Sequence, residues 1–172
     1  MWAYSLQILI YRNSMQELKV NLLAEGLRIV LVASRFNEMV VDRLIEGASD
    51  TFRQFGGNPD ELLLSRVPGA FEISTAARQF AETEAYDAIV CLGAVIRGAT
   101  SHYDHVCSAV TSGVASVGAD TGIPTIFGLL TTDTIEQAIE RSGTKLGNQG
   151  RYAMQAAIEM ANLSRVIGRR HD

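Results

Sequence analysis

The stretch AIVCLGAV, residues 88–95, decides the fold, because it is apolar throughout and about as long as one β-strand. A strand that is apolar on both faces belongs in a parallel sheet covered by helices on each side. Similar apolar runs occur at residues 27–33, 61–67 and 126–130, and a helical pattern follows each of them. The sequence therefore predicts a three-layer α/β sandwich with a four-stranded parallel sheet and right-handed crossovers.

Helices are indicated where apolar residues recur every three or four positions. After the first run, this spacing extends from Val41 to Phe52, and Gly56-Gly57 ends it. Single helices are expected after the second and third runs, and two after the fourth run, separated by a break at residues 143–150. Upstream, Leu18, Val20 and Leu22 alternate with polar residues, which predicts a separate half-buried strand at a sheet edge, on a neighbouring subunit.

Composition narrows the class of protein. The 172 residues are 47% hydrophobic and 20% charged, as expected of one globular domain. The net charge is −4 and basic residues form no cluster, so the chain lacks the basic surface that is typical of a nucleic-acid-binding protein. The N-terminal apolar run is short and broken by Gln7, so neither a signal peptide nor a membrane span is expected. Two cysteines without a secretory signal favour a cytoplasmic protein with reduced thiols.

The strand ends carry the candidate chemistry, because ligands of open parallel sheets bind beyond the carboxyl ends of the strands. These ends read SRFN (34–37), PGAFE (68–72), RGATSH (97–102) and TTDT (131–134). In the third, Gly98 permits an unusual turn before a helix, whose free N–H groups and dipole favour an anion such as phosphate. Ser101 and Asp104 also fit a capping pattern, so the hydroxyls of this turn either cap the helix or serve an anion site.

Two of the three histidines, His102 and His105, lie close together in this region. Their spacing allows a shared helix face, but Cys107 points elsewhere and His171 lies in a terminal tail, so a zinc site lacks ligands. We therefore expect no metal. His102, beside the candidate anion site, is interpreted as a proton-transfer residue, because imidazole titrates near neutral pH. His105 is interpreted as a half-exposed helix residue.

Four further candidates have ordinary structural explanations. Phe36 and Phe127 are typical of core packing, although Phe36 lies in a loop where a planar ligand could stack on it. Glu72 suits the first turn of its helix and Arg141 the last turn of another, because of the helix dipole. From the residues alone, a structural role and a role in ligand binding both stay open for each of the four.

Five segments, in order and with matching spacing, resemble the lumazine synthase family. They are SRFNEMVVDRLIEGA (34–48), RVPGAFEI (66–73), GAVIRGATSHYDHV (93–106), PTIFGLLTTDTIEQAIERSGTKLGN (124–148) and AAIEMANL (156–163). The resemblance implies a single flavodoxin-like domain over residues 15–172. Residues 1–14 are expected to be an extension outside it, either a misassigned start before Met15 or an added segment.

The resemblance implies a transferase that acts at the penultimate step of riboflavin biosynthesis. The reaction condenses 5-amino-6-(D-ribitylamino)uracil with 3,4-dihydroxy-2-butanone 4-phosphate and releases phosphate and water. The product is 6,7-dimethyl-8-ribityllumazine, and the reaction needs no metal or organic cofactor. None of its steps requires a redox centre; they require two substrates held together and a proton shuttle.

The resemblance also assigns roles by motif position. His102 is implied as the proton donor. The uracil substrate is implied to contact a stacking aromatic ring, a ribityl-binding segment and the end of the third strand: Phe36, Ala70, Phe71, Glu72, Ala94, Val95 and Ile96. The phosphate substrate is implied to contact Ala99 and Thr100, with Phe127 and Arg141 supplied by the adjacent subunit and Arg141 on the phosphate.

Assembly is implied by the same resemblance. Members form homopentamers with sites between subunits, and many build icosahedral capsids of roughly 60 subunits. The N-terminal strand is implied to join a neighbour's sheet, and the short segment GTKLGNQG (143–150) favours the 60-subunit shell. Riboflavin synthase is implied as a further partner.

Two positions depart from the family pattern. Gln149 stands where many members carry a lysine near the phosphate, and His105 replaces an apolar or aromatic residue. Two other functions are therefore kept open. One is a flavodoxin-like flavin or nucleotide carrier, although SRFNE after the first strand is not a hydroxyl-rich phosphate loop. The other is a shell with a structural or storage role and degraded catalysis.

Overall fold

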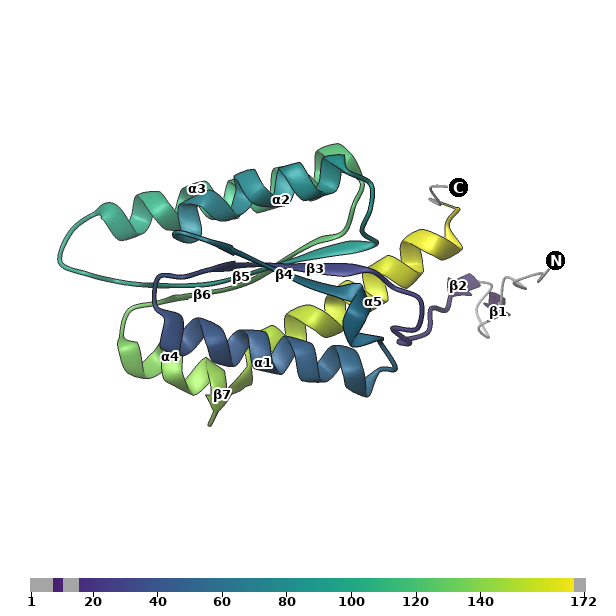
Figure 1. Ribbon diagram of the computed structural model, residues 1–172, viewed down its shortest axis with the longest axis horizontal. Helices are drawn as coiled ribbons and strands as arrows, with labels where there is room; N and C mark the ends of the chain where they lie inside the picture. Colours follow the sequence, from purple (N-terminus) through teal and green to yellow (C-terminus); the bar gives the residue numbers. More distant parts are fainter. Residues whose placement is uncertain (1–7, 11–15, 169–172) are drawn as a thin grey trace.

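A four-stranded parallel sheet forms the middle layer of the computed structural model, which describes residues 8–10 and 16–168 (Figure 1). Its strands run in the order β4-β3-β5-β6. Their bounds are Ile29–Ser34 for β3, Leu62–Val67 for β4, Ala88–Ile96 for β5 and Thr125–Thr132 for β6. All three neighbouring pairs are parallel, so the predicted sheet is confirmed.

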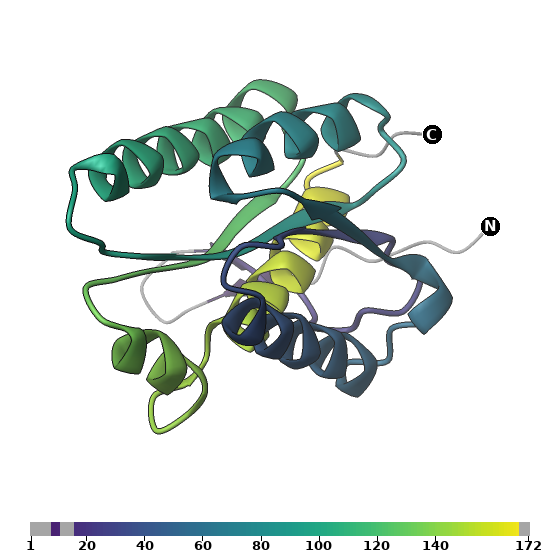
Figure 2. The same cartoon turned by 60° about the vertical axis from the view of Figure 1, so that its left-hand side comes forward.

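Five helices cover the two faces of this sheet, so the predicted three-layer sandwich is confirmed (Figures 1 and 2). One face carries α2 and α3, and the other carries α1, α4 and α5. Their bounds are Glu38–Gln54 for α1, Ile73–Glu82 for α2, His102–Thr121 for α3, Ile135–Arg141 for α4 and Gln149–Val166 for α5. Within the described residues, no helix has the length and apolarity needed to cross a bilayer.

Alternate side chains of the two central strands pack into separate cores. Val30 and Ile89 belong to the cluster under α2 and α3, whereas Leu31 and Val90 belong to the cluster under α1 and α5. Every residue of β3 is buried, which explains why the run is apolar without alternation. Cys91 is also fully buried, and this burial raises the pKa of its thiol to about 12.

The second apolar run differs from the others, because β4 is an edge strand. Leu63 and Leu64 are both 42% exposed, so the expectation that every run is buried on both faces is wrong for β4. The physical reason is that β4 lies at the edge of the sheet, where β3 is its one neighbouring strand among the described residues. An exposed apolar edge of this kind is usually covered in the native protein.

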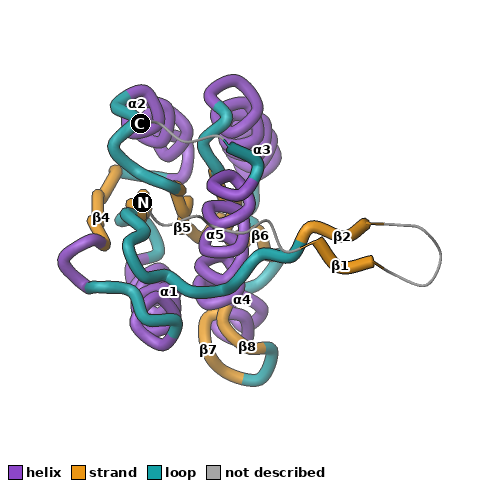
Figure 3. Tube along the Cα trace, turned by 90° about the vertical axis from the view of Figure 1, so that its right-hand side faces the viewer, coloured by secondary structure: helices purple, strands orange, loops and turns teal. Residues whose placement is uncertain are grey.

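The N-terminal strand is shorter than expected. It is β2 (Gln16–Leu18), and it pairs antiparallel with β1 (Ile8–Ile10) in a sheet of its own, set apart from the central domain (Figure 3). The alternation up to Leu22 does not continue the strand, and Leu22 is 43% exposed. Part of the expected extension over residues 1–14 is therefore a strand, at residues 8–10; the rest lies outside the described residues.

The break expected at residues 143–150 contains a small hairpin. Its strands are β7 (Ser142–Thr144) and β8 (Gly147–Asn148), and α5 begins directly after it at Gln149. The side chain of Asn148 caps α5 by accepting a hydrogen bond from the Arg151 N–H at 3.1 Å. Gly150 therefore lies inside the first turn of a helix and does not interrupt one. Two short 3-10 helices, η1 (Pro59–Glu61) and η2 (Ala70–Glu72), complete the described structure.

Candidate active site

The four polar loops lie at one end of the sheet, because all four strands point the same way. The chain order changes direction at β3, which has β4 on one side and β5 on the other. Ligands of open parallel sheets bind in the crevice expected at such a switch point, here between the loops after β3 and β5. Phe36 follows β3, and the RGATSH turn follows β5.

Backbone contacts hold the loop after β3. The N–H of Arg35 donates to the Val67 carbonyl at 2.8 Å, and that of Phe36 donates to the Pro68 carbonyl at 3.3 Å. Asn37 adopts the left-handed conformation, with φ of 60°, and its side-chain amide donates to the Ala94 carbonyl at 2.8 Å. The ring of Phe36 stays 72% exposed, so the core-packing explanation is wrong for this residue.

The next loop forms η2 in front of α2. Ala70 is buried, while Phe71 is 60% exposed. Glu72 is exposed at the start of α2, and its carboxylate accepts a hydrogen bond from the Gly69 N–H at 2.9 Å. This bond closes the turn that presents Phe71, so the carboxylate has a structural role in addition to the expected interaction with the helix dipole.

The end of β5 brings the third group of candidates to the same edge. Ala94 is buried, and Val95 and Ile96 are half-buried and pair with Thr131 and Thr132 of β6. Because Asn37 binds the Ala94 carbonyl, the loop after β3 is fixed to this strand end. The loop after β3 and the end of β5 are therefore held in one arrangement.

The turn of residues 98–101 is exposed, and none of the hydrogen bonds found among the described residues uses its backbone N–H groups. Ser101 is in the helical conformation and caps α3 with no side-chain bond, so the capping pattern expected from Ser101 and Asp104 is wrong. Asp104 instead forms an ion pair with Arg97. Ala99 and Thr100 thus offer the free donors that an anion requires.

Both histidines lie in the first turn of α3 and are exposed. The N–H of His102 donates to the Thr100 hydroxyl at 3.4 Å, which places this residue directly beside the free donors of the turn. Within the described residues, no group of three or more His, Cys, Asp or Glu side chains is placed to hold a metal ion. His171 lies outside the described residues.

The two remaining candidates line a different surface. Phe127 and Arg141 border a pocket of about 590 Å³ between β6, α4 and the start of α5. Gln149 lines the same pocket, but Phe36, Glu72 and the turn of residues 98–101 do not. The candidate residues of a single chain therefore fall into two separate groups, here termed half-sites: one around the ends of β4, β3 and β5, and one beside the edge strand β6.

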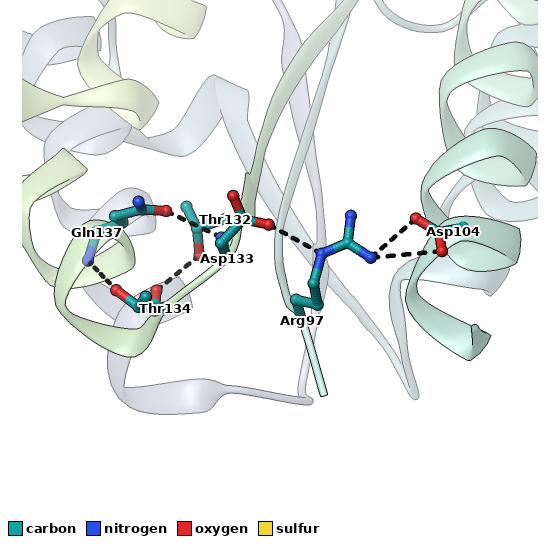
Figure 4. Close-up of polar contacts among 6 residues, drawn as sticks. All are labelled: Arg97, Asp104, Thr132, Asp133, Thr134 and Gln137. Carbon is teal, nitrogen blue, oxygen red and sulfur yellow. Dashed lines mark hydrogen bonds and ion pairs between the residues drawn. The ribbon is translucent and has the colours of Figure 1, made fainter. Parts of the chain in front are cut away.

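Sequence reasoning missed Asn37 and Arg97 as residues that order the site. Asn37 follows an aromatic residue at a strand end, and asparagine tolerates the left-handed conformation, which is a usable signal. Arg97 lies between Asp104 and Asp133, to which it binds (Figure 4). Its partners are 7 and 36 positions away in the sequence, so no local pattern reveals them.

An open parallel sheet with polar loops at its switch point and free N–H groups at a helix start is the arrangement of α/β proteins whose ligands bind beyond the carboxyl ends of the strands. The family model for 6,7-dimethyl-8-ribityllumazine synthase matches residues 26–165. The chain belongs to this family, which places it among the transferases of riboflavin synthesis. The resemblance seen in the sequence is therefore confirmed.

Proposed function

We propose that the protein condenses 5-amino-6-(D-ribitylamino)uracil with 3,4-dihydroxy-2-butanone 4-phosphate to 6,7-dimethyl-8-ribityllumazine. The observation that carries this proposal is the turn of residues 98–101, whose free N–H groups lie at the start of α3 next to His102. A phosphate fits such a turn, because unpaired donors and the helix dipole both favour an anion. Family membership supplies the substrate class.

Each substrate is assigned to one part of the crevice. The exposed ring of Phe36 stacks on the pyrimidine, and the ribityl chain lies along Ala70, Phe71 and Glu72. The pyrimidine edge reaches the end of β5, formed by Ala94, Val95 and Ile96. Ala99 and Thr100 bind the phosphate of the second substrate.

The chemistry needs contact between substrates and movement of protons. The amine of the pyrimidine attacks the ketone, and loss of water gives an imine. Proton removal next to the imine then expels phosphate and leaves an enol, which tautomerises to a ketone. The second amine attacks this ketone and closes the ring with loss of another water. Holding both substrates together lowers the barrier by several kcal/mol, and His102 moves protons to the leaving groups. The donors of the turn stabilise the charge on the departing phosphate.

The second half-site is assigned to the neighbouring subunit of a homopentamer. In this arrangement Phe127 and Arg141 of one subunit complete the crevice of the next, with Arg141 on the phosphate. Two observations support this: both residues line a pocket apart from Phe36, and the edge strand β4 exposes Leu63 and Leu64. The N-terminal strand of a neighbour would cover that edge by strand addition.

We expect the pentamers to assemble into an icosahedral shell of roughly 60 subunits, with riboflavin synthase as a further partner. The connection between α4 and α5 is a tight hairpin, β7 and β8, without an insertion. Light scattering is expected to give a mass near 60 times that of the 18.7 kDa chain. A mass near that of one pentamer would contradict the shell.

The assay that tests the proposed function mixes both substrates and follows the fluorescence of the lumazine product. Wild-type protein is expected to form product well above the uncatalysed rate. His102→Ala is expected to lower kcat by about tenfold, because one proton-transfer group is lost while substrate proximity is kept. His105→Ala, one helical turn further along α3, is the matched control and is expected to retain activity.

Two results of this assay decide against parts of the proposal. Absence of product formation by wild-type protein would favour a flavin carrier or a storage shell. The neutral Gln149, which lines the same pocket as Arg141, is the observation that supports the storage shell. Equal rates for His102→Ala and wild type would show that another group moves the protons.

A further inference from the structure

Three elements meet at Arg97, which follows β5 directly (Figure 4). Its backbone N–H donates to the Thr132 carbonyl at 2.9 Å. Its Nε donates to the carboxylate of Asp133 at 2.8 Å, and its Nη1 lies 3.1 Å from the carboxylate of Asp104. Asp133 follows β6, and Asp104 lies in the first turn of α3. One side chain thus connects two strand ends with the start of a helix.

Tyr103 reinforces this connection. The guanidinium carbon of Arg97 lies 4.0 Å from the centre of the Tyr103 ring, in cation–π geometry. Tyr103 lies in the first turn of α3, so this contact is a second link between Arg97 and the start of the helix. The Asp133 carboxylate, with a smaller contribution from Asp104, raises the pKa of Arg97. Arg97 therefore contacts the first turn of α3 through two residues, Tyr103 and Asp104.

The turn of residues 98–101 spans the gap between these fixed points. Among the described residues, its own N–H groups make no hydrogen bond. Its last two residues are bonded to α3. The Ser101 carbonyl accepts from the N–H of Asp104 at 3.0 Å and from that of His105 at 3.4 Å, and the Thr100 hydroxyl accepts from the N–H of His102 at 3.4 Å. The conformation of the turn therefore depends on the positions of its two ends. Arg97 directly precedes the turn, and its side chain binds Asp104 in the helix that follows the turn.

The positive charge of Arg97 is already neutralised by neighbouring carboxylates. One guanidinium faces two carboxylates, so the cluster carries a net charge of −1 and offers no spare cation to a phosphate. Exposed ion pairs of this kind contribute little to global stability one by one. Their geometry, with Nε and Nη1 on different carboxylates, nevertheless fixes the direction of both partners. Arg97 is thus better suited to hold backbone in place than to bind the ligand.

We propose that Arg97 is a positioning residue for phosphate binding, which sets the turn of residues 98–101 so that its free N–H groups converge on the phosphate. This inference rests on the proposed function. The same contact reaches α4, because the Asp133 N–H donates to the Gln137 side chain at 2.9 Å and Thr134 caps that helix. Arg97 thereby also holds the helix that ends at Arg141.

The decisive variant is Arg97→Lys, which keeps the charge but loses the fork that binds two carboxylates at once. We expect the KM for 3,4-dihydroxy-2-butanone 4-phosphate to rise by about three- to tenfold, because the donors of the turn no longer converge. The KM for the pyrimidine substrate is expected to stay within about twofold, since Phe36 and its loop are held by other contacts. The KM difference separates positioning from a general loss of stability.

Arg78→Lys is the matched control. Arg78 forms an ion pair with Asp120 of α3, far along the helix from the turn. The Arg78→Lys variant is therefore expected to change neither KM. A second readout needs no substrate: amide hydrogen exchange in residues 104–106 is expected to accelerate about fivefold in Arg97→Lys and not in Arg78→Lys. This readout tests the contact even if wild-type protein forms no lumazine, a result that would reject the proposed function alone.

Three outcomes would overturn the positioning role. Unchanged KM for the phosphate substrate in Arg97→Lys would show that charge alone suffices. An equal rise of both KM values would show a general structural defect. Unchanged exchange at residues 104–106 would show that the turn is held without Arg97.

Discussion

Replacing Gly150 by alanine is expected to lower the unfolding temperature by about 6–12 °C, which corresponds to about 3 kcal/mol for a chain of this size. A Cβ at this position would lie 1.9 Å from the Leu44 carbonyl oxygen and 2.7 Å from its carbon. Both atoms belong to the backbone of α1, so no side-chain rotation relieves the clash. The two helices must move apart, and buried contacts between α1 and α5 are lost.

Gly118→Ala is the matched control, because it also adds a methyl group to a glycine within a helix. There the new Cβ would meet its nearest neighbours at 3.6 Å, an ordinary contact distance. Alanine is favoured over glycine in helices by about 1 kcal/mol, so the unfolding temperature is expected to stay or rise. Scanning calorimetry at one protein concentration compares the two variants. Equal unfolding temperatures would show that α1 and α5 can separate without loss.

The close approach at Gly150 also bears on the second half-site. Gln149 is the first residue of α5 and lines the pocket with Arg141, so the contact with Leu44 fixes where this pocket ends. Asn148 adds a second anchor, because its side-chain amide donates to the Arg43 carbonyl at 2.8 Å. Displacement of α5 is therefore expected to disturb the pocket as well as the core.

Sequence periodicity predicted the central sheet and its helices because each element has a local apolar pattern of its own. The role of Gly150 cannot be predicted from such local patterns. A glycine next to Gly147 and Gly143 reads as part of a loop, yet here its missing side chain lets two helices touch. Close packing of this kind depends on residues about a hundred positions apart, which no local window contains.

In the candidate site, too, local patterns predict some features, while others depend on contacts between distant residues. The position of His102 followed from a strand end and a helix start, both of which are local. Asp104 was read as a capping residue, because the spacing from Ser101 fits; in the structure Arg97 binds it instead. Whether Asp104 caps α3 or pairs with Arg97 depends on where β5, which Arg97 follows, ends relative to α3. Only the folded chain contains that information.

Mixing two inactive variants is expected to restore about one quarter of the wild-type sites, if each site is shared between subunits of a closed ring. In the proposed site, Phe36→Ala removes the stacking ring of one half-site, and Arg141→Ala removes the cation of the other. Stacking of a base on an aromatic ring contributes about 1–3 kcal/mol, and a charged hydrogen bond about 1.5–3 kcal/mol. Each variant alone is therefore expected to lose about 10- to 100-fold in kcat/KM.

The one-quarter figure follows from random co-assembly. A shared site is intact only when the subunit that supplies Phe36 is the Arg141→Ala variant and its neighbour is the Phe36→Ala variant. With equal amounts of both, each condition holds about half of the time. The two variants are dissociated together, reassembled and assayed, and kcat per subunit is compared with that of wild type treated in the same way.

Two controls make the result specific. Assembled variants mixed without dissociation are expected to stay at the level of the single variants, because no new interfaces form. The double variant, mixed and reassembled with wild type, is expected to give about one quarter as well, since only wild-type neighbours then form intact sites. If Phe36 and Arg141 served one site within a single chain, the first mixture would stay inactive while this second one reached about one half. The difference between these values distinguishes a site between subunits from one inside a subunit.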